Sequence, residues 1–249
     1  MGNDACSRQR STHHNTMTTE ITEANFLDFT CPYCGELNSF PQDATGFVRE
    51  CVNCRESLIV PEAGSEAGLK IPVPITTPRL VLRRLGARDW KDLMEFRFND
   101  EEEALRWLEN DHVVKLTTPD QTFSLGVELR DGGKIIGCLG LKFIDQDVLQ
   151  AEVLVSWNED PQYSDFANEA VAGLLDFCFA GVKLHRVIAK CGSSNSEGCR
   201  MLEAAGMRRE GEFVKNYYGD GEWLGTVWFA MLDEEYREGG SSPTEASST

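Results

Sequence analysis

The sequence predicts a mixed α+β domain preceded by a small metal-binding module, and three observations support this. Strand-like and helix-like stretches alternate from residue 77 to residue 236. Two C-x-x-C pairs lie upstream, within residues 26–61. A stretch rich in Pro, Gly and Ala, residues 62–76, separates the two regions and is typical of a linker. The polar residues 1–25 and the Gly- and Ser-rich residues 237–249 are predicted to be disordered.

The composition limits the classes of partner. The chain of 249 residues carries a formal net charge of −17. So acidic a surface repels phosphate backbones and anionic lipids, which argues against nucleic-acid and membrane partners and favours cationic ones such as amines. The sequence shows neither a long apolar run nor a secretory leader, although it holds nine cysteines. We therefore expect a cytoplasmic protein whose paired cysteines bind metal.

The two C-x-x-C pairs have the spacing of a zinc ribbon. Sixteen residues separate them, and each pair can direct two thiolates at one ion. Four protein ligands leave no open position, so the predicted Zn²⁺ is structural rather than catalytic. A redox pair of C-x-x-C motifs is the alternative. The predicted zinc ligands are Cys31, Cys34, Cys51 and Cys54.

Periodicity places the elements of the larger region. An Asp-Gly-Gly turn at 131–133 and a Gly-Asp-Gly turn at 219–221 predict hairpins. Strands are predicted at 77–85, 121–130, 134–144, 150–158 and 186–191, with two more within 210–232. Helices are predicted at 89–98, 101–109, 166–180 and 196–205.

Several short motifs then resemble one family. They are TPRLVLR at 77–83, LHRVIA at 184–189, Asn195, RMLEAAGM at 200–207, GEW at 221–223 and VWFAML at 227–232. In this order they resemble the ribosomal-protein N-terminal acetyltransferase branch of the GNAT superfamily. The resemblance covers nearly everything after the linker. It implies the GNAT fold, a mixed and mostly antiparallel central sheet flanked by helices, and acetyl-CoA as the acyl donor.

The resemblance also implies where acetyl-CoA binds. Family members hold its pyrophosphate on backbone N–H groups at a helix start that follows a splayed strand. The corresponding loop, residues 162–170, has Asp165 and Tyr163 where the family has glycines. Asp165 is expected to cap the helix and to compete with the phosphates for its N–H groups. The predicted cofactor-binding residues are Val155, Trp157, Gln162, Tyr163, Ser164, Asp165, Phe166, Ala167 and Asn195.

Glu152 is the candidate catalytic base. It resembles the strand glutamate that many family members place near the acceptor amine, and an ion-paired strand glutamate is the alternative. The general acid is unassigned, because Gly198 and Leu202 stand where family members have a serine or a tyrosine.

The resemblance predicts an N-acetyltransferase that moves an acetyl group to an amine, either a protein N-terminus or a small amine. The acetyl group passes by direct attack in a ternary complex. The alternative is a non-catalytic relative with a weakened CoA site that acts as an adaptor. In either case the ribbon is a candidate docking site for a protein partner.

Overall fold

The computed structural model describes residues 25–117, 120–145, 149–219 and 221–239. Nearly all of the two predicted disordered ends therefore lies outside the described residues. The exception at the C-terminal end is α5, Asp233–Gly239, which includes the first three residues of the predicted tail. The centre of the predicted turn at 219–221 also lies outside them.

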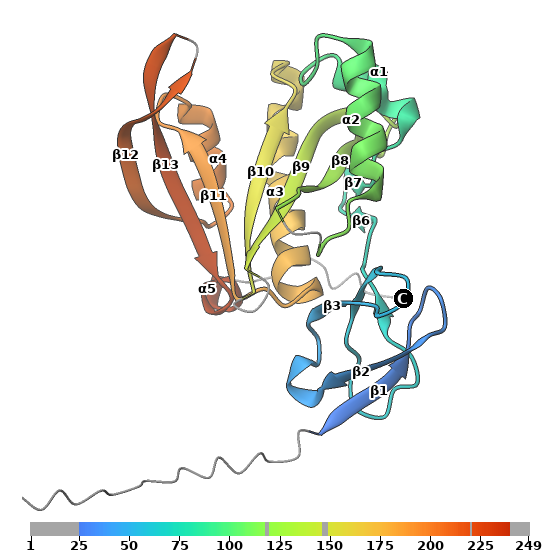
Figure 1. Cartoon of the computed structure of the whole chain (residues 1–249). Coiled ribbons are helices and arrows are strands. Elements are labelled where there is room, and N and C mark those ends of the chain that lie inside the picture. The colour runs from blue at the N-terminus through green and yellow to red at the C-terminus, as the bar shows by residue number, and fades with distance from the viewer. Residues whose placement is uncertain (1–24, 118–119, 146–148, 220, 240–249) are drawn as a thin grey trace, which may run out of the picture.

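An eight-stranded sheet forms the larger domain (Figure 1). The strands lie in the order β12-β13-β11-β10-β9-β8-β7-β6. Only β10 and β11 pair in parallel, so the mixed, mostly antiparallel fold is confirmed. The strands are β6 (Ile75–Thr76), β7 (Leu80–Arg83), β8 (Phe123–Leu129), β9 (Ile135–Asp145), β10 (Gln150–Trp157), β11 (Arg186–Gly192), β12 (Arg208–Gly219) and β13 (Glu222–Leu232).

Helices cover both faces of this sheet (Figure 1). α1 (Trp90–Leu93) and α2 (Glu101–Val113) lie on one face, and α3 (Ser164–Asp176) and α4 (Ser196–Ala204) lie on the other. The helix predicted at 89–98 is shorter than expected, because a turn after α1 leads to Asp100, whose side chain caps α2. None of the described helices combines the length and apolar character needed to cross a bilayer.

Each face of the sheet has its own apolar core. Val171 and Leu174 of α3 pack with Leu82 and Leu139 in the larger core, and all four are almost fully buried. Leu108 of α2 belongs to a smaller core on the other face. Burial of side chains on both faces stabilises the central strands and fixes their register.

The cysteine-bearing module is two small sheets around a separate cluster. β1 (Phe26–Thr30) pairs with β2 (Leu37–Pro41), and β3 (Val48–Glu50), β4 (Ser57–Ile59) and β5 (Leu69–Lys70) form the second sheet. The buried members of the cluster are Phe29, Cys31, Ala44, Cys51, Leu58 and Val60. Residues 62–76, predicted as a linker, contain β5 and β6, so structured chain joins the module to the large sheet.

Candidate active site and metal centre

A cleft opens where the two parallel strands separate. β10 and β11 pair only from Gln150 to Val153 on β10, although both strands continue further (Figure 1). Beyond Val153 and Ala189 the backbone N–H and C=O groups of the two facing edges lack each other as partners. The cleft, about 1170 Å³, is lined by these strand ends and by the first turns of α3 and α4. It is large enough for a long ligand.

A second cavity, about 410 Å³, lies on the side of β10 that faces α2. Trp107 and Asn110 of α2 line it together with Leu154 of β10. Val155 and Ser156 line both cavities. Two ligands that enter from opposite faces of the sheet therefore meet at this point of β10, which is the arrangement that a two-substrate transfer requires.

Asp160, rather than Asp165, caps the start of the helical segment beside the cleft. Asp160 Oδ1 accepts from the backbone N–H of Gln162 (3.1 Å), and its carbonyl accepts from Tyr163 N–H (2.9 Å). The next N–H group, of Ser164, donates to the carbonyl of Pro161. The prediction that Asp165 caps the helix is wrong, because a 3₁₀ turn, Pro161–Tyr163, precedes α3 and moves the helix start upstream. An aspartate followed by proline is a favoured way to begin a helix.

Trp157 connects the end of β10 to this helix start. Its Nε1 donates to the carbonyl of Tyr163 (3.3 Å). Gly137, its cross-strand neighbour on β9, makes room for the ring, since a Cβ there would lie 2.4 Å from the ring atom Cε3. Glycine at this position therefore permits the contact that holds the loop against the sheet.

Six of the nine predicted cofactor-binding residues line the cleft: Val155, Trp157, Ser164, Asp165, Ala167 and Asn195. The other three are engaged elsewhere. Gln162 donates its side-chain amide to Asp160 (2.7 Å), Tyr163 is buried, and the ring of Phe166 lies under the guanidinium of Arg79 at 4.3 Å. Other residues that were not predicted from the sequence also line the cleft, among them Ser156, Asn158, Asp160, Asn168, Lys190, Gly192 and Arg200. The Asp-Pro pair at 160–161 was the sequence signal that could have identified one of them.

The charges around the cleft are predominantly acidic. Four carboxylates line it, and two basic side chains oppose them. The carboxylates are those of Glu159, Asp160, Asp165 and Glu197, and the basic residues are Lys190 and Arg200. A ligand with several phosphates therefore meets both occupied helix-start donors and like charge at this site.

Comparison with known proteins decides the family. The family model described as "Acetyltransferase (GNAT) domain" matches residues 79–208, just over half of the chain. This chain belongs to the GNAT acetyltransferase family. The matched region contains both cavities' strand walls and the starts of α3 and α4, and it excludes the cysteine-bearing module.

Individual proteins that resemble this acetyltransferase are themselves named as acetyltransferases. The chain is 29% identical over 173 residues to the uncharacterized N-acetyltransferase YnaD of Bacillus subtilis (strain 168), a match covering 65% of this chain and 98% of YnaD. A GNAT-family acetyltransferase structure from Bacillus anthracis is 25% identical, with a TM-score of 0.56, and the match covers 64% of this chain and 98% of that one. The spermidine/spermine N-acetyltransferase SpeG from Vibrio cholerae, at 20% identity and a TM-score of 0.55 over 66% of this chain and 98% of its own, shares the fold.

In this acetyltransferase Asn195 caps α4. Its Oδ1 accepts from the backbone N–H of Gly198 (2.8 Å), and the residue also lines the cleft. A Cβ at Gly198 would lie 2.7 Å from the Cys191 sulfur and 2.9 Å from the side-chain nitrogen of Asn195. The tight cap accounts for glycine where family members have a serine, and it leaves no side chain there to donate a proton.

Glu152 is paired with a lysine on the neighbouring strand. Lys190 Nζ lies 3.1 Å from a carboxylate oxygen of Glu152, and its ammonium also lies 4.5 Å from the centre of the Trp228 ring. Glu152 lines neither cavity. With about 3.3 Å of rise per residue, Ser156 lies roughly 13 Å further along β10, so a proton passing between that point and Glu152 needs water.

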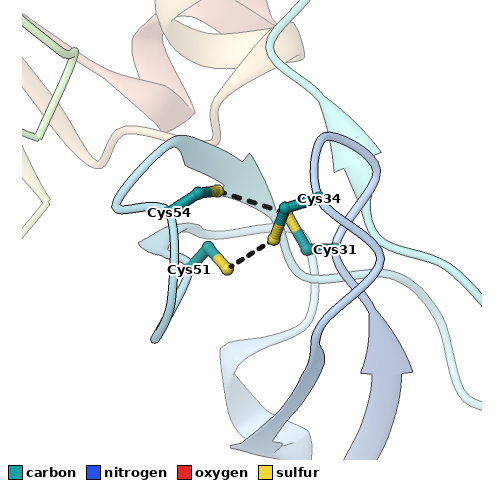
Figure 2. A group of neighbouring side chains, drawn as sticks. All are labelled: Cys31, Cys34, Cys51 and Cys54. Atoms are coloured by element: carbon teal, nitrogen blue, oxygen red, sulfur yellow. Dashed lines mark hydrogen bonds between the residues drawn. The ribbon is translucent and has the colours of Figure 1, made fainter.

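The four predicted zinc ligands lie together in the cysteine-bearing module, residues 26–61, which is called the ribbon from here on (Figure 2). Their sulfur atoms all lie within 4.8 Å of one another. The Cys31–Cys54 and Cys34–Cys51 sulfur pairs are each 3.7 Å apart. A tetrahedron with Zn–S bonds of about 2.3 Å has edges of about 3.8 Å, which these two pairs match, and four cysteine thiols are a donor set that suits Zn²⁺.

Hydrogen-bond donors surround these sulfurs. Tyr33 N–H donates to the Cys31 sulfur (3.4 Å), and the side-chain amide of Asn38 donates to that of Cys51 (3.7 Å). Burial acts to raise the pKa of Cys51, but the backbone N–H groups of Asn53 and Cys54, with other donors, outweigh it and lower the pKa to about 6. These donors stabilise the thiolate of Cys51, whereas burial and the neighbouring sulfurs raise the pKa of Cys31 and of Cys54.

Proposed function

We propose that this protein is an acetyl-CoA-dependent N-acetyltransferase that acetylates an amine by direct attack in a ternary complex. The observation that carries the proposal is the meeting of two cavities at Val155 and Ser156, inside a domain of the GNAT acetyltransferase family. The cleft between β10 and β11 holds the donor, and the cavity beside α2 admits the acceptor. Each substrate enters from its own face of the sheet.

The reaction exchanges two bonds at the acetyl carbon. The neutral amine nitrogen attacks the thioester carbonyl, the new N–C bond forms, and the C–S bond breaks as the thiolate of CoA leaves and takes up a proton. Backbone N–H groups on the unpaired edge of β10 are suited to polarise the carbonyl oxygen. Glu152 is the proposed base, and it receives the proton of the ammonium through water.

The proposed acceptor is a protein N-terminus or a small amine. The net charge of −17 supports a cationic acceptor because it raises the local concentration of cations. The likeness to the ribosomal-protein acetyltransferase branch supports a protein N-terminus. The two classes differ in size, so a panel of spermidine and short peptides with free N-termini separates them.

A second candidate function rests on the helix start at Asp160. Its N–H groups have acceptors within the chain, and four carboxylates line the cleft. Two like charges about 4 Å apart cost up to about 4 kcal/mol at the dielectric of a protein surface, roughly a thousandfold in affinity. With that loss, the domain is a poor acetyltransferase, and the ribbon is the functional element as an adaptor that binds a protein partner.

We further propose that the ribbon holds one structural Zn²⁺ through Cys31, Cys34, Cys51 and Cys54. The spacing of the sulfurs and the N–H donors around them support this assignment. All four positions are taken by protein, so the ion stabilises the fold and takes no part in acetyl transfer. One mole of zinc per mole of chain, by elemental analysis of protein purified without chelator, is the expected result.

Calorimetric titration with acetyl-CoA, followed by measurement of CoA release with the amine panel, tests the enzyme proposal. Binding together with amine-dependent CoA release is expected. Absence of binding at millimolar acetyl-CoA would favour the adaptor. In the same assay Glu152→Gln should lower kcat by about tenfold or more, with unchanged acetyl-CoA affinity, because general bases contribute about 10²–10⁴.

The matched control for Glu152→Gln is Lys190→Gln, which removes the ion pair and keeps the carboxylate. Retained kcat in Lys190→Gln with reduced kcat in Glu152→Gln supports the base. Equal small losses in both variants assign Glu152 to the ion pair alone.

A further inference from the structure

The ribbon is packed into the acetyltransferase domain rather than tethered to it. Val48 of β3 and Ile59 of β4 are buried and belong to the larger core of the domain. Leu116, in the connection between α2 and β8, belongs to the same core and is also buried. The aliphatic chain of Lys183 approaches Gly46, since a Cβ there would lie 3.4 Å from its Cγ. The second sheet of the ribbon therefore shares an apolar interface with the domain.

Among the described residues, hydrogen bonds and an ion pair reinforce this interface at residues 115–117. The hydroxyls of Ser57 and Thr117 lie 3.0 Å apart, and both residues are buried. Thr117 donates its hydroxyl to Glu50 (3.0 Å) and its N–H to Ser57 Oγ (3.3 Å). Lys115 pairs with Glu56. The ribbon thus holds both ends of a three-residue segment of the catalytic domain.

The ribbon residues that make these contacts directly flank the second C-x-x-C pair. Glu50 immediately precedes Cys51. The turn runs from Cys51 to residue 55, and Glu56 and Ser57 follow it directly. The N–H of Cys51 donates to the carbonyl of Glu56 (3.0 Å), which closes that turn. The position of the contact residues therefore depends on the geometry of the turn, and a metal bound to its two cysteines fixes that geometry.

The held segment adjoins the wall of the acceptor cavity. Val114, immediately before it, lines that cavity, as do Gln121 and Thr122 shortly after it. Thr122 also lies tightly against Gly140 of β9, where a Cβ would be 2.4 Å from its methyl group. The donor cleft, in contrast, is lined by β10, β11, α3 and α4. A displacement of residues 115–117 should therefore change the shape of the acceptor cavity more than that of the donor cleft.

We infer that the metal-bound ribbon positions the wall of the acceptor cavity through its contact with residues 115–117, and that it leaves the donor cleft unchanged. This inference rests on the proposed acetyl transfer and on the proposed zinc. The ribbon then acts as a positioning element for the acceptor, although it lies outside the matched family region. Loss of the metal or of the contact should change acceptor binding and spare acetyl-CoA binding.

The test uses the full chain with Thr117→Val, which keeps the volume of the side chain and removes its hydroxyl. Hydrogen exchange read by mass spectrometry is expected to be about tenfold faster in peptides covering 114–117 and 121–125, because buried hydrogen bonds are lost. Peptides from α3 and α4 should exchange at the wild-type rate. The acetyl-CoA dissociation constant should stay within about twofold, while KM for spermidine or the best peptide of the panel rises at least about threefold.

Thr226→Val is the matched control, because it removes a threonine hydrogen bond to Asn216 in the β12–β13 hairpin. Wild-type exchange at 114–125 in Thr117→Val would overturn the inference, and so would equal acceleration throughout the domain. If Thr117→Val fails to fold, Ser57→Ala removes the same pair from the ribbon side.

Removal of zinc distinguishes this inference from the zinc and enzyme proposals on which it rests. Chelated wild-type protein should show the same local acceleration at 114–125 as Thr117→Val. A response to Thr117→Val with none to chelation overturns the metal's part in the coupling. Protein that contains no zinc refutes the zinc proposal, and protein that does not bind acetyl-CoA refutes the enzyme proposal. In both cases the exchange data on Thr117→Val still decide whether the ribbon holds residues 115–117.

Discussion

The ribbon and the acetyltransferase cleft both place polar groups around a ligand site, but they differ in what those groups contact within the chain. In the ribbon four sulfurs converge within 4.8 Å of one another, and a small apolar cluster packs beside them. In the cleft the donors at the start of the 3₁₀ turn already have acceptors, including the side chain of Asp160. The proposed metal would therefore complete the ribbon, whereas a phosphate bound at the helix start beside the cleft would have to displace an interaction that the protein makes with itself.

Removing the metal is the strongest test of this difference. Cys51→Ser should unfold the ribbon, because structural zinc contributes on the order of 10 kcal/mol to such modules. Backbone amides across residues 26–61 should lose their protection from hydrogen exchange. The strands of the large sheet should stay protected, because most of the core that covers them comes from the domain itself rather than from Val48 and Ile59 of the ribbon.

Cys199→Ser is the control for Cys51→Ser, since Cys199 is a half-buried thiol of α4 outside the metal cluster. It should leave the ribbon protected and the zinc content at one per chain. Full protection of residues 26–61 in Cys51→Ser would show that the apolar cluster holds the ribbon without metal.

The sequence predicted these two regions to different depths, for physical reasons. The cysteine cluster was predictable because its geometry is local: two cysteines in each turn suffice. Most strands of the sheet were predictable from periodicity. The cap at Asp160 was not recognised, because its role depends on a 3₁₀ turn ahead of α3, and the meeting of the cavities at Ser156 depends on where two distant strands separate. The packing of Val48 into the large core depends on tertiary contacts that periodicity does not encode.

Asp160→Asn tests the cleft side of the comparison. Asparagine keeps an oxygen that caps Gln162 and removes the negative charge. We expect acetyl-CoA to bind about tenfold more tightly, a change of about 1.4 kcal/mol, because phosphate no longer meets a carboxylate at the helix start. Isothermal titration calorimetry measures the dissociation constant.

The control for Asp160→Asn is Asp165→Asn, an exposed carboxylate that also lines the cleft but caps no helix. A smaller gain in affinity is expected there. If the two variants bind acetyl-CoA equally, general charge in the cleft rather than the occupied helix start limits binding. Unchanged affinity in Asp160→Asn would place the phosphates away from this helix start.

The smallest effect comes from a difference between the two turns of the ribbon itself. Each C-x-x-C pair is followed by a residue with positive φ, Gly35 at 76° and Arg55 at 60°. The N–H of each donates to the carbonyl of the first cysteine of its pair, at 3.0 and 3.1 Å, so the two turns are equivalent in backbone structure. Only glycine adopts this conformation without steric cost, which for other residues is about 1–2 kcal/mol.

Arg55→Gly should therefore raise the stability of the zinc-bound ribbon. The expected net gain is about 0.5–1 kcal/mol, because the loss of the ion pair with Glu50 and the added flexibility of the unfolded chain offset part of the relieved strain. The matched change, Gly35→Ala, should lower it by a similar amount, and chelator titration followed by zinc release measures both. A loss of stability in Arg55→Gly would mean that the exposed ion pair outweighs the backbone strain.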